Sequence, residues 1–341
     1  MRVTGIPTVL ALLLLLGGAA PATLVTPEEH RRPADNTFLT GPEWFLVFSP
    51  EEYAAYLPHH APSRFPFVGH ISQFWQGYAA ISRADTLPHP NYSYHLMIAV
   101  IGVSTTVEYG LKVLYETTAG RFTEAVSGVT GNAPDTAEDR LAAKTAADYV
   151  AFIKVQPWYE FDFVTPLKAV WSDTGWWGQH PLRKWERKYM LTSEYAAKAA
   201  YGWALGRATR ASYDRPIERT FVVLRGFEGE LPKDVQRVGG SGDSAAFLLP
   251  RYQAFTTDAQ AMANSGADFR EIAGNRDGIM VSIVAASEFT PPQGGRLLYR
   301  QEILTQPGLD RFALSYPVAK LGAVLRALNR ARIPVEHVYD Y

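Results

Sequence analysis

Histidine is the residue type whose positions first suggest chemistry in this sequence. Five of the eight His lie between positions 59 and 95, and imidazole both binds metal ions and transfers protons near neutral pH. The candidate metal ligands are His59, His60, His70 and His95. For acid–base catalysis the candidates are His70, His95 and Glu108. Their spacings place no two ligands one helical turn apart, so the sequence favours surface and helix-capping roles over a metal or catalytic site.

A block of aromatic residues between positions 158 and 189 is the second candidate site. Five of the eight Trp fall between 158 and 185. The candidate ligand or interface residues are Trp158, Tyr159, Trp171, Trp176, Trp177 and Trp185. The basic residues among them are Lys168, Arg183, Lys184, Arg187 and Lys188. Three interpretations stay open: rings packed between helices, a belt at a membrane interface, and a platform for a ligand such as a carbohydrate.

Composition and missing motifs exclude several classes of function. The 33 Lys and Arg nearly balance the 34 Asp and Glu, and no basic tract is present, so nucleic-acid binding is not expected. The absence of Cys excludes disulfides, thiolate zinc sites, iron–sulfur clusters and cysteine nucleophiles. The sequence also lacks a phosphate-binding loop, an H-E-x-x-H zinc motif and a nucleophile elbow. No cofactor can therefore be assigned.

The first 25 residues have the pattern of a signal peptide or signal anchor. No charged residue occurs between Val3 and Thr26, and the centre contains five consecutive leucines. Ala20 and Ala22 form the A-x-A pattern of a signal peptidase site, which favours cleavage over a permanent anchor. The polar residues 26–42 then predict an exposed linker.

A second apolar stretch, residues 94–115, has two interpretations. It is long enough to span a bilayer as a helix, but Glu108 and Lys112 interrupt its second half. As a membrane span it would carry both charges inside the bilayer, where they need partners. As a helix of a soluble domain it would bury its first half and expose this i, i+4 pair.

Residues 43–216 are predicted to form a mainly helical domain. Ser49 and Pro50 have the pattern of a helix start, with Ser49 as the N-cap. Aromatic and aliphatic residues between Phe65 and Ile81 recur every three or four positions, as on one face of a helix. Further helices are expected from Thr136 to about Val155 and from Leu182 to Tyr213.

Residues 217–341 are predicted to form an α+β domain, with a ferredoxin-like sandwich as one arrangement. Short β-branched or alternating segments predict strands, and two helical segments separate them. Gly240–Ala245 is read as a hairpin loop and Gly274–Gly278 as a hairpin connector between two strands. No internal repeat is evident in the sequence.

These features predict a membrane-associated or exported protein of the cell envelope. Its C-terminal α+β domain is expected to bind a partner or ligand, and membrane lipid is the expected partner of the N-terminal part. The alternative is an enzyme at the membrane surface that acts on a lipid-like substrate through a His/Glu acid–base or metal site. The identity of any protein or small-molecule partner is not encoded in a recognisable motif.

Overall fold

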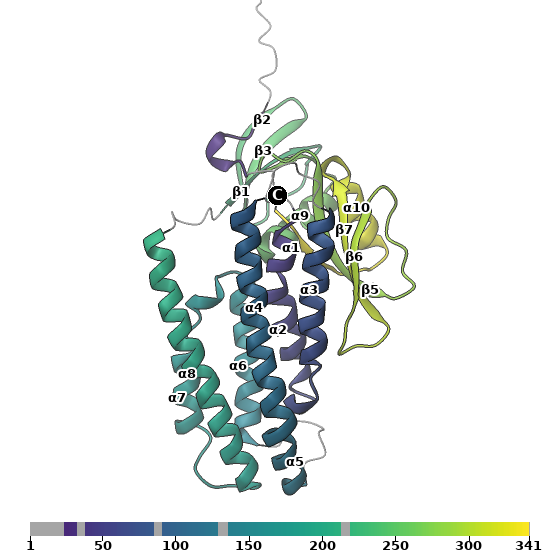
Figure 1. Ribbon diagram of the computed structural model, residues 1–341. Helices are drawn as coiled ribbons and strands as arrows, with labels where there is room; N and C mark the ends of the chain where they lie inside the picture. Colours follow the sequence, from purple (N-terminus) through teal and green to yellow (C-terminus); the bar gives the residue numbers. More distant parts are fainter. Residues whose placement is uncertain (1–23, 33–37, 85–90, 129–135, 213–218, 341) are drawn as a thin grey trace, which may run out of the picture.

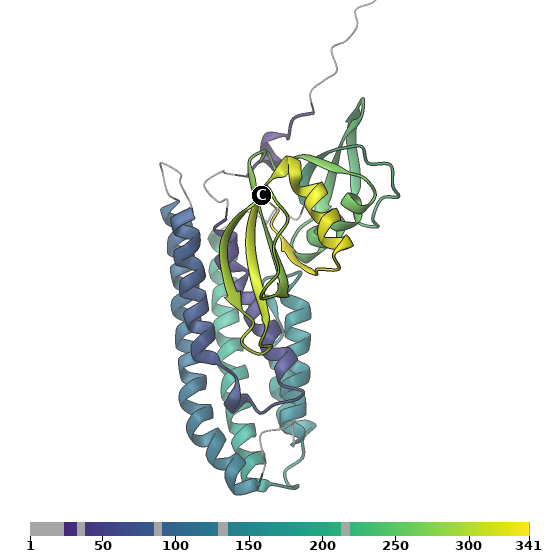
Figure 2. The same ribbon diagram turned by 90° about the vertical axis from the view of Figure 1, so that its right-hand side faces the viewer.

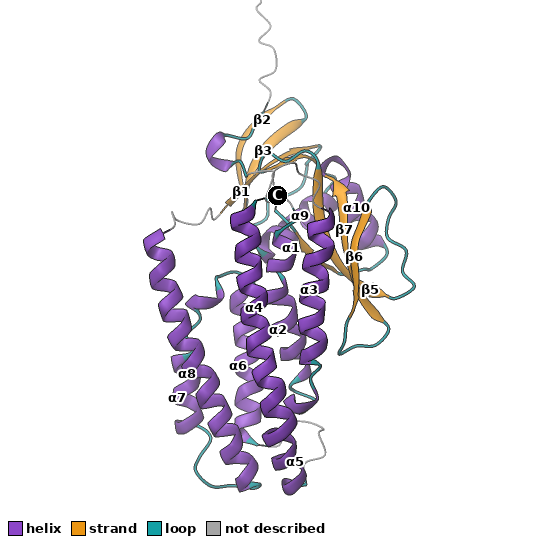
Figure 3. Cartoon of the chain, in the orientation of Figure 1, coloured by secondary structure: helices purple, strands orange, loops and turns teal. Residues whose placement is uncertain are grey.

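The chain folds into a helical bundle with two β-sheets at one end and along one side (Figure 1). The structure is a computed structural model, and it describes residues 24–340 apart from 33–37, 85–90, 129–135 and 213–218. Most of the predicted signal segment thus lies outside the described residues. The expected α+β class is confirmed, with helices first and strands second along the chain (Figure 3).

The bundle consists of long helices joined by short turns. Its helices are α1 (Thr40–Glu43), α2 (Phe45–Tyr56), α3 (Phe67–Ala84), α4 (Tyr92–Tyr115), α5 (Arg121–Ser127), α6 (Ala137–Ile153), α7 (Val164–Ser172) and α8 (Pro181–Ser212). A five-residue π-helix, Glu116–Gly120, joins α4 to α5 without a break. Short 3-10 turns lie at Glu28–His30, Pro62–Arg64 and Trp158–Glu160.

In α3 and α6, the structure explains the sequence signals that predicted a helix. On α3, Phe67, Phe74 and Ile81 recur every seven residues and are all buried, so they form one apolar stripe toward the bundle interior. At the start of α6, the Thr136 hydroxyl accepts a hydrogen bond from the Asp139 N–H (3.1 Å), and the Asp139 carboxylate accepts one from the Thr136 N–H (3.3 Å). This reciprocal capping box fixes the first turn.

The predicted helix start at Ser49 is wrong. Helix α2 begins at Phe45, immediately after α1, and Pro50 lies inside it. Ser49 is buried, and its hydroxyl lies 2.9 Å from the Nδ1 atom of His70 instead of capping a helix end. A side chain from a distant helix therefore takes the hydrogen bond that the local pattern assigned to the backbone.

Residues 24–32 form an N-terminal strap that lies against the first sheet. The N–H and hydroxyl of Thr26 both donate to the carboxylate of Glu271, and the Arg32 N–H donates to the Ala273 carbonyl at 3.0 Å. These bonds tie the strap to the last strand of that sheet and to the residue after it.

The expected exposure of residues 26–42 is seen only in part among the described residues: Glu28, Glu29 and Arg31 are exposed, whereas Thr26 is buried. The strap covers the beginning of this range, and Leu39 is fully buried just before α1. Residues 33–37 lie outside the described residues. Polar composition suggested exposure, but the strap satisfies its polar groups with partners from the C-terminal part.

The C-terminal part contains two antiparallel sheets of four strands each. The first has the order β2-β3-β1-β4, with β1 (Arg219–Arg225), β2 (Gln236–Ser241), β3 (Ser244–Pro250) and β4 (Asp268–Ile272). The second has the order β6-β7-β5-β8, with β5 (Gly278–Ala286), β6 (Arg296–Glu302), β7 (Leu309–Pro317) and β8 (Val335–Val338). In place of one ferredoxin-like sandwich, the chain forms two sheets with one long helix each.

The two sheets are a structural repeat that the sequence does not reveal. Each unit runs β-β-β-α-β, with helix α9 (Gln253–Asn264) in the first and α10 (Val318–Arg330) in the second. Both units have the same strand order, and all their pairings are antiparallel. The register also matches where the third strand of each unit ends, just before its helix: Arg219 pairs with Pro250 in the first unit, and Gly278 pairs with Pro317 in the second.

Two short glycine-containing segments differ in their roles. Gly242 and Asp243 form the predicted two-residue hairpin between β2 and β3, and Gly242 adopts a positive φ of 60° that such turns require. The segment Gly274–Gly278 is not a hairpin connector, because β4 and β5 belong to different sheets. It links the two repeats.

Each sheet buries one face in a common core and the other against a different neighbour. The common core lies between both sheets and helices α9 and α10. The other face of the second sheet lies against the bundle (Figure 2). There Met280 and Ala313 pack against Trp44 and Phe48. The equivalent face of the first sheet packs Phe221 against the strap. The bundle is thus fixed to the second repeat.

Candidate functional site

A seam of opposite charges joins α4 and α5 to α8. The two helical segments run antiparallel, so the residue number falls on one side of the seam as it rises on the other. The four pairs are Glu124 with Arg183 (3.5 Å), Glu116 with Arg187 (2.8 Å), Lys112 with Glu194 (2.9 Å) and Glu108 with Lys198 (3.0 Å). The charged side chains of α4 and α5 in these pairs therefore point toward α8 rather than outward.

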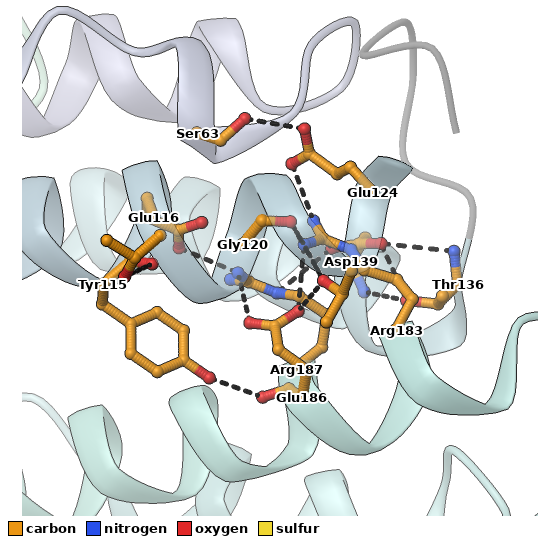
Figure 4. Close-up of polar contacts among 12 residues, drawn as sticks. Ser63, Tyr115, Glu116, Gly120, Glu124, Thr136, Asp139, Arg183, Glu186 and Arg187 are labelled. Atoms are coloured by element: carbon orange, nitrogen blue, oxygen red, sulfur yellow. Dashed lines mark hydrogen bonds and ion pairs between the residues drawn. The ribbon is translucent and has the colours of Figure 1, made fainter. Parts of the chain in front are cut away.

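The lower part of the seam is a closed cluster around two guanidinium groups (Figure 4). Arg183 and Arg187 are only 1% and 2% exposed. Arg187 contacts Glu116 and, at 3.3 Å, Asp139, and Arg183 contacts Glu186 at 2.9 Å. Buried arginines are tolerated only when paired and hydrogen-bonded, so this cluster fixes how α5, α6 and α8 meet.

Two lysines of α8 are buried on its neighbouring face. The ammonium groups of Lys184 and Lys188 lie 2.7 Å and 3.3 Å from one oxygen of Glu138 on α6, and both donate to Thr174. Together with Arg183 and Arg187, these are four of the five basic residues that the sequence placed among the aromatic rings. They pair inside the bundle and do not reach its surface.

Among the described residues, the outward faces of α4 and of α8 between Tyr189 and Gly206 carry almost no charge. The Glu108 side chain is 41% exposed at the seam, and Arg207 is exposed just beyond this stretch of α8. Within α4, which is described throughout, the exposed residues are Tyr92, Ser93, Leu96, Met97, Val100, Val103, Ser104, Val107, Gly110, Leu111 and Leu114. On α8 between Tyr189 and Gly206, they are Tyr189, Ser193, Ala196, Ala197, Ala200, Tyr201, Trp203 and Ala204. We call these residues the uncharged face. It reverses the usual arrangement of a bundle in water, in which charges lie outside and apolar residues inside.

The opposite side of the bundle has the ordinary polarity of a water-exposed surface. Helix α6 exposes Arg140, Lys144 and Asp148. Lys168 of α7 and Asp173, immediately after that helix, are also exposed. In Figure 1 these two helices lie behind α4 and α8. In the described part of the bundle, one side therefore has almost no exposed charge and the opposite side is charged.

The aromatic block divides into two places. The rings of Trp171, Trp176 and Trp185 contact one another, with centroids 5.5 to 6.2 Å apart, and Trp177 beside them is 82% exposed. This tryptophan cluster lies where α7 leads into α8. Trp158 and Tyr159 are separate from it and pack near the other end of α8, where Trp158 contacts Tyr201.

The candidate histidines do not converge on one site. The His95 Nδ1 atom lies 2.9 Å from the Tyr78 hydroxyl, and His59 and His60 are exposed in the turn after α2. Glu108 pairs with Lys112 and Lys198, whereas His70 lies beside Ser49 and Glu52. Among the described residues, no three His, Asp or Glu side chains are placed to hold a metal ion.

His70 instead belongs to a buried polar chain that runs from α4 to the second sheet. Its Nδ1 atom lies 2.9 Å from the Ser49 hydroxyl, which is 2.6 Å from the Tyr109 hydroxyl on α4. Its Nε2 atom lies 3.5 Å from Glu52, and Glu52 accepts a hydrogen bond from Arg311 of β7 at 3.1 Å. The sequence singled out His70 as a candidate and assigned Ser49 to a helix cap, but it could not place Tyr109 and Arg311 beside them, because these residues come from distant segments.

Burial sets the protonation states of Glu52 and His70 in this polar chain. Removal from water raises the pKa of Glu52 to about 6, although the Arg311 guanidinium opposes the rise. Burial, with a smaller contribution from Arg311, lowers the pKa of His70 to about 3, so its imidazole is neutral at pH 7. Ser49, His70 and Glu52 have the residue types of a catalytic triad, but Ser49 and His70 are 1% and 0% exposed. In this conformation a substrate does not reach them.

Comparison with known proteins found no matching family model, no matching curated protein and no matching solved structure. The function of the chain is therefore inferred from the geometry of the bundle and its two attached sheets.

Proposed function

We propose that this protein is a membrane-associated protein of the cell envelope that rests on a bilayer through the uncharged face and presents its C-terminal α+β part to a partner or ligand. The observation that carries this proposal is the inward direction of the charges on α4 and α8. A helix that turns its charges inward and its aliphatic side chains outward is suited to an apolar neighbour.

The size of the uncharged face supports an extended apolar neighbour. Seven large aliphatic side chains of α4 are exposed along its length: Leu96, Met97, Val100, Val103, Val107, Leu111 and Leu114. If half of each such side chain left water, the gain would be about 1 kcal/mol apiece. Aromatic rings at Tyr92, Tyr189 and Trp203 lie on the same face, and such rings favour the boundary between headgroups and hydrocarbon.

A side-on position on the bilayer fits the bundle better than a transbilayer position. The continuous helix Tyr92–Ser127 is the one described helix that is long and apolar enough to cross a membrane, which by itself is weak support for crossing. If it crossed, Lys144 and Asp148 of the neighbouring α6 would be carried into the hydrocarbon, at a cost of several kcal/mol. With the bundle lying side-on, these residues remain in water.

A cavity beside the strap supports ligand binding by the C-terminal part. It has a volume of about 450 Å³ and is lined by Val25, Arg31, Arg32, Glu271, Gly274 and Arg276. Its three arginines already have partners: Arg31 donates to the Thr26 carbonyl, Arg32 pairs with Asp340 and Arg276 pairs with Glu271. We propose that a carboxylate or phosphate of a ligand joins them as a further acceptor.

The alternative, an enzyme at the membrane surface with a His/Glu site, is supported by the arrangement of Ser49, His70 and Glu52. It requires α2 and α3 to open toward solvent. In that case, His70→Asn would abolish hydrolysis of a lipid ester while leaving thermal unfolding nearly unchanged. If the buried polar chain has only a structural role, the same substitution would instead lower the stability of the protein.

The experiment that tests membrane association is flotation with lipid vesicles. We use the chain beginning at Thr23, which is what cleavage after Ala22 would leave and which retains every described residue. We expect this chain to float with vesicles and to be released by alkaline carbonate, as a side-on protein would be. Retention after carbonate would favour a transbilayer helix. A chain that stays at the bottom of the gradient would contradict the proposal.

A further inference from the structure

We infer that the uncharged face takes zwitterionic phospholipid and does not need anionic lipid. This inference rests on the proposed function and names the class of lipid for the same surface. It depends on the seam, in which the basic side chains that could otherwise attract lipid phosphates are paired with carboxylates of the protein.

The seam leaves few cations for lipid headgroups. Lys112 lies within 3.3 Å of both Glu108 and Glu194, and it is buried between α4 and α8. Lys198 contacts the same two carboxylates at 3.0 Å and 2.8 Å. Each ammonium group is therefore held between two carboxylates of this chain, which compete with a phosphate outside the bundle. The Lys198 side chain remains 23% exposed.

The basic residues in the lower part of the seam are also unavailable to lipid phosphates. Arg183, Lys184, Arg187 and Lys188 are all buried and paired with carboxylates of α5, α6, α8 or the π-helix. In many peripheral proteins the corresponding basic residues flank the apolar face and bind anionic lipid. Here the equivalent charges face the protein interior.

The rings on the uncharged face provide binding that is independent of lipid charge. Tyr92, Tyr189, Tyr201 and Trp203 are exposed there, and their preference for the interface comes from an amphipathic ring rather than from a net charge. At one end of the face, Arg207 lies over the ring of Trp203, 5.1 Å from its centroid. Among the described residues, this exposed arginine lies next to a ring of the face, where it would add a limited preference for anionic lipid.

The test compares two kinds of vesicle at two salt concentrations. The chain beginning at Thr23 is mixed with vesicles of phosphatidylcholine alone, or of phosphatidylcholine with phosphatidylglycerol, and its partition coefficient is measured by sedimentation. Each basic residue that met an anionic surface would raise partitioning about fivefold, and high salt would remove that gain. We therefore expect the two vesicle types to differ by less than about fivefold, with little effect of salt.

A matched variant shows that the assay can detect lipid charge. Ser193→Lys combined with Ala197→Lys places two ammonium groups on exposed positions of α8. This variant should prefer the anionic vesicles by about twenty-fold or more, and salt should abolish the preference.

The possible outcomes distinguish failure of this inference from failure of the proposed membrane association. Binding of the parent chain to anionic vesicles only, lost at high salt, would overturn the inference and leave membrane association standing. Binding to neither kind of vesicle would overturn both. Self-association in solution without vesicle binding would also overturn both, and would assign the face to a second copy of the chain.

Discussion

Glu116 of the π-helix and Arg187 of α8 lie 2.8 Å apart, and both side chains are 2% exposed. They form the most deeply buried of the four pairs that join α4 and α5 to α8. Removing Arg187 would leave Glu116 as an uncompensated buried charge, which typically costs about 3–5 kcal/mol, whereas Arg187 would keep Asp139 as a partner if Glu116 were removed. The seam thus stabilises the bundle and is also the reason its outer face is uncharged.

A double-mutant cycle should show this coupling. We expect Arg187→Met to lower the free energy of unfolding by about 3 kcal/mol or more. Glu116→Leu combined with Arg187→Met should cost less than the sum of the two single changes, because the double variant leaves one carboxylate fewer without a partner. Urea unfolding measures all three variants, and strict additivity would contradict the coupling.

The exposed pair Lys144 and Asp148 on α6 is the matched control. Their side chains are 73% and 55% exposed, although the charged atoms are only 2.5 Å apart. Lys144→Ala should change stability by less than about 0.5 kcal/mol.

Charges placed on the uncharged face should abolish membrane binding without unfolding the protein. Val103 and Val107 on α4 are each 56% exposed. A charged residue in an apolar membrane position costs roughly 2.5–3.5 kcal/mol, so Val103→Glu or Val107→Glu should weaken vesicle binding about 100-fold. Ala147→Glu on the exposed side of α6 is the control and should bind normally. Equal loss of binding in the α4 and α6 variants would argue against the assigned face.

Two glycines of α4 should respond to alanine in opposite ways. A Cβ atom at Gly102 would lie 2.3 Å from a ring atom of Phe74 and 2.8 Å from Trp75, so Gly102→Ala must push α3 and α4 apart, at a cost of about 1–3 kcal/mol. A Cβ atom at Gly110 would meet nothing within 4 Å. There the higher helix propensity of alanine should stabilise the fold by up to about 1 kcal/mol. Thermal unfolding of both variants checks the contrast, which would fail if the two shifts had the same sign.

His70 and Glu52 should contribute in opposite directions to the change in stability between pH 7 and pH 5. His337, whose pKa burial also lowers to about 3, acts in the same direction as His70. The pKa of His70 is lowered to about 3, so protonation of the unfolded chain below pH 6.5 disfavours folding. The pKa of Glu52 is raised to about 6, so the folded chain binds a proton first and gains stability as the pH falls from 6 toward 4.5.

Single substitutions should separate these two contributions. Glu52→Gln removes the group that opposes the two histidines, so the free energy of unfolding should fall between pH 7 and pH 5 by about 1 kcal/mol more than in the parent chain. His70→Gln should make the free energy of unfolding fall by about 2 kcal/mol less than in the parent chain over the same range. Urea unfolding at several pH values measures both slopes. Identical slopes in the two variants would be incompatible with the assigned pKa directions.

The sequence by itself determined the class of the fold and most of its elements. Apolar residues spaced three and four positions apart located α3, and a long alanine-rich stretch located α8. The cap at Thr136 located the start of α6. All three signals are local in the sequence. Strand β2 was missed, since its Gly239 and Gly240 have low strand propensity and it is held by pairing with β3. The order of strands and their division into two repeats were likewise invisible, because pairing partners are set by the whole chain.

Only the tertiary structure decided which way the charges face. The sequence shows Glu108 and Lys112 four residues apart, a spacing equally suited to an exposed ion pair and to a buried one. Their partners Glu194 and Lys198 lie more than 80 positions along the chain, and no local pattern encodes such a pairing. Electrostatic attraction across the antiparallel helices turned these charges inward, and that choice left an uncharged surface where the sequence alone allowed either a membrane helix or an ordinary soluble one.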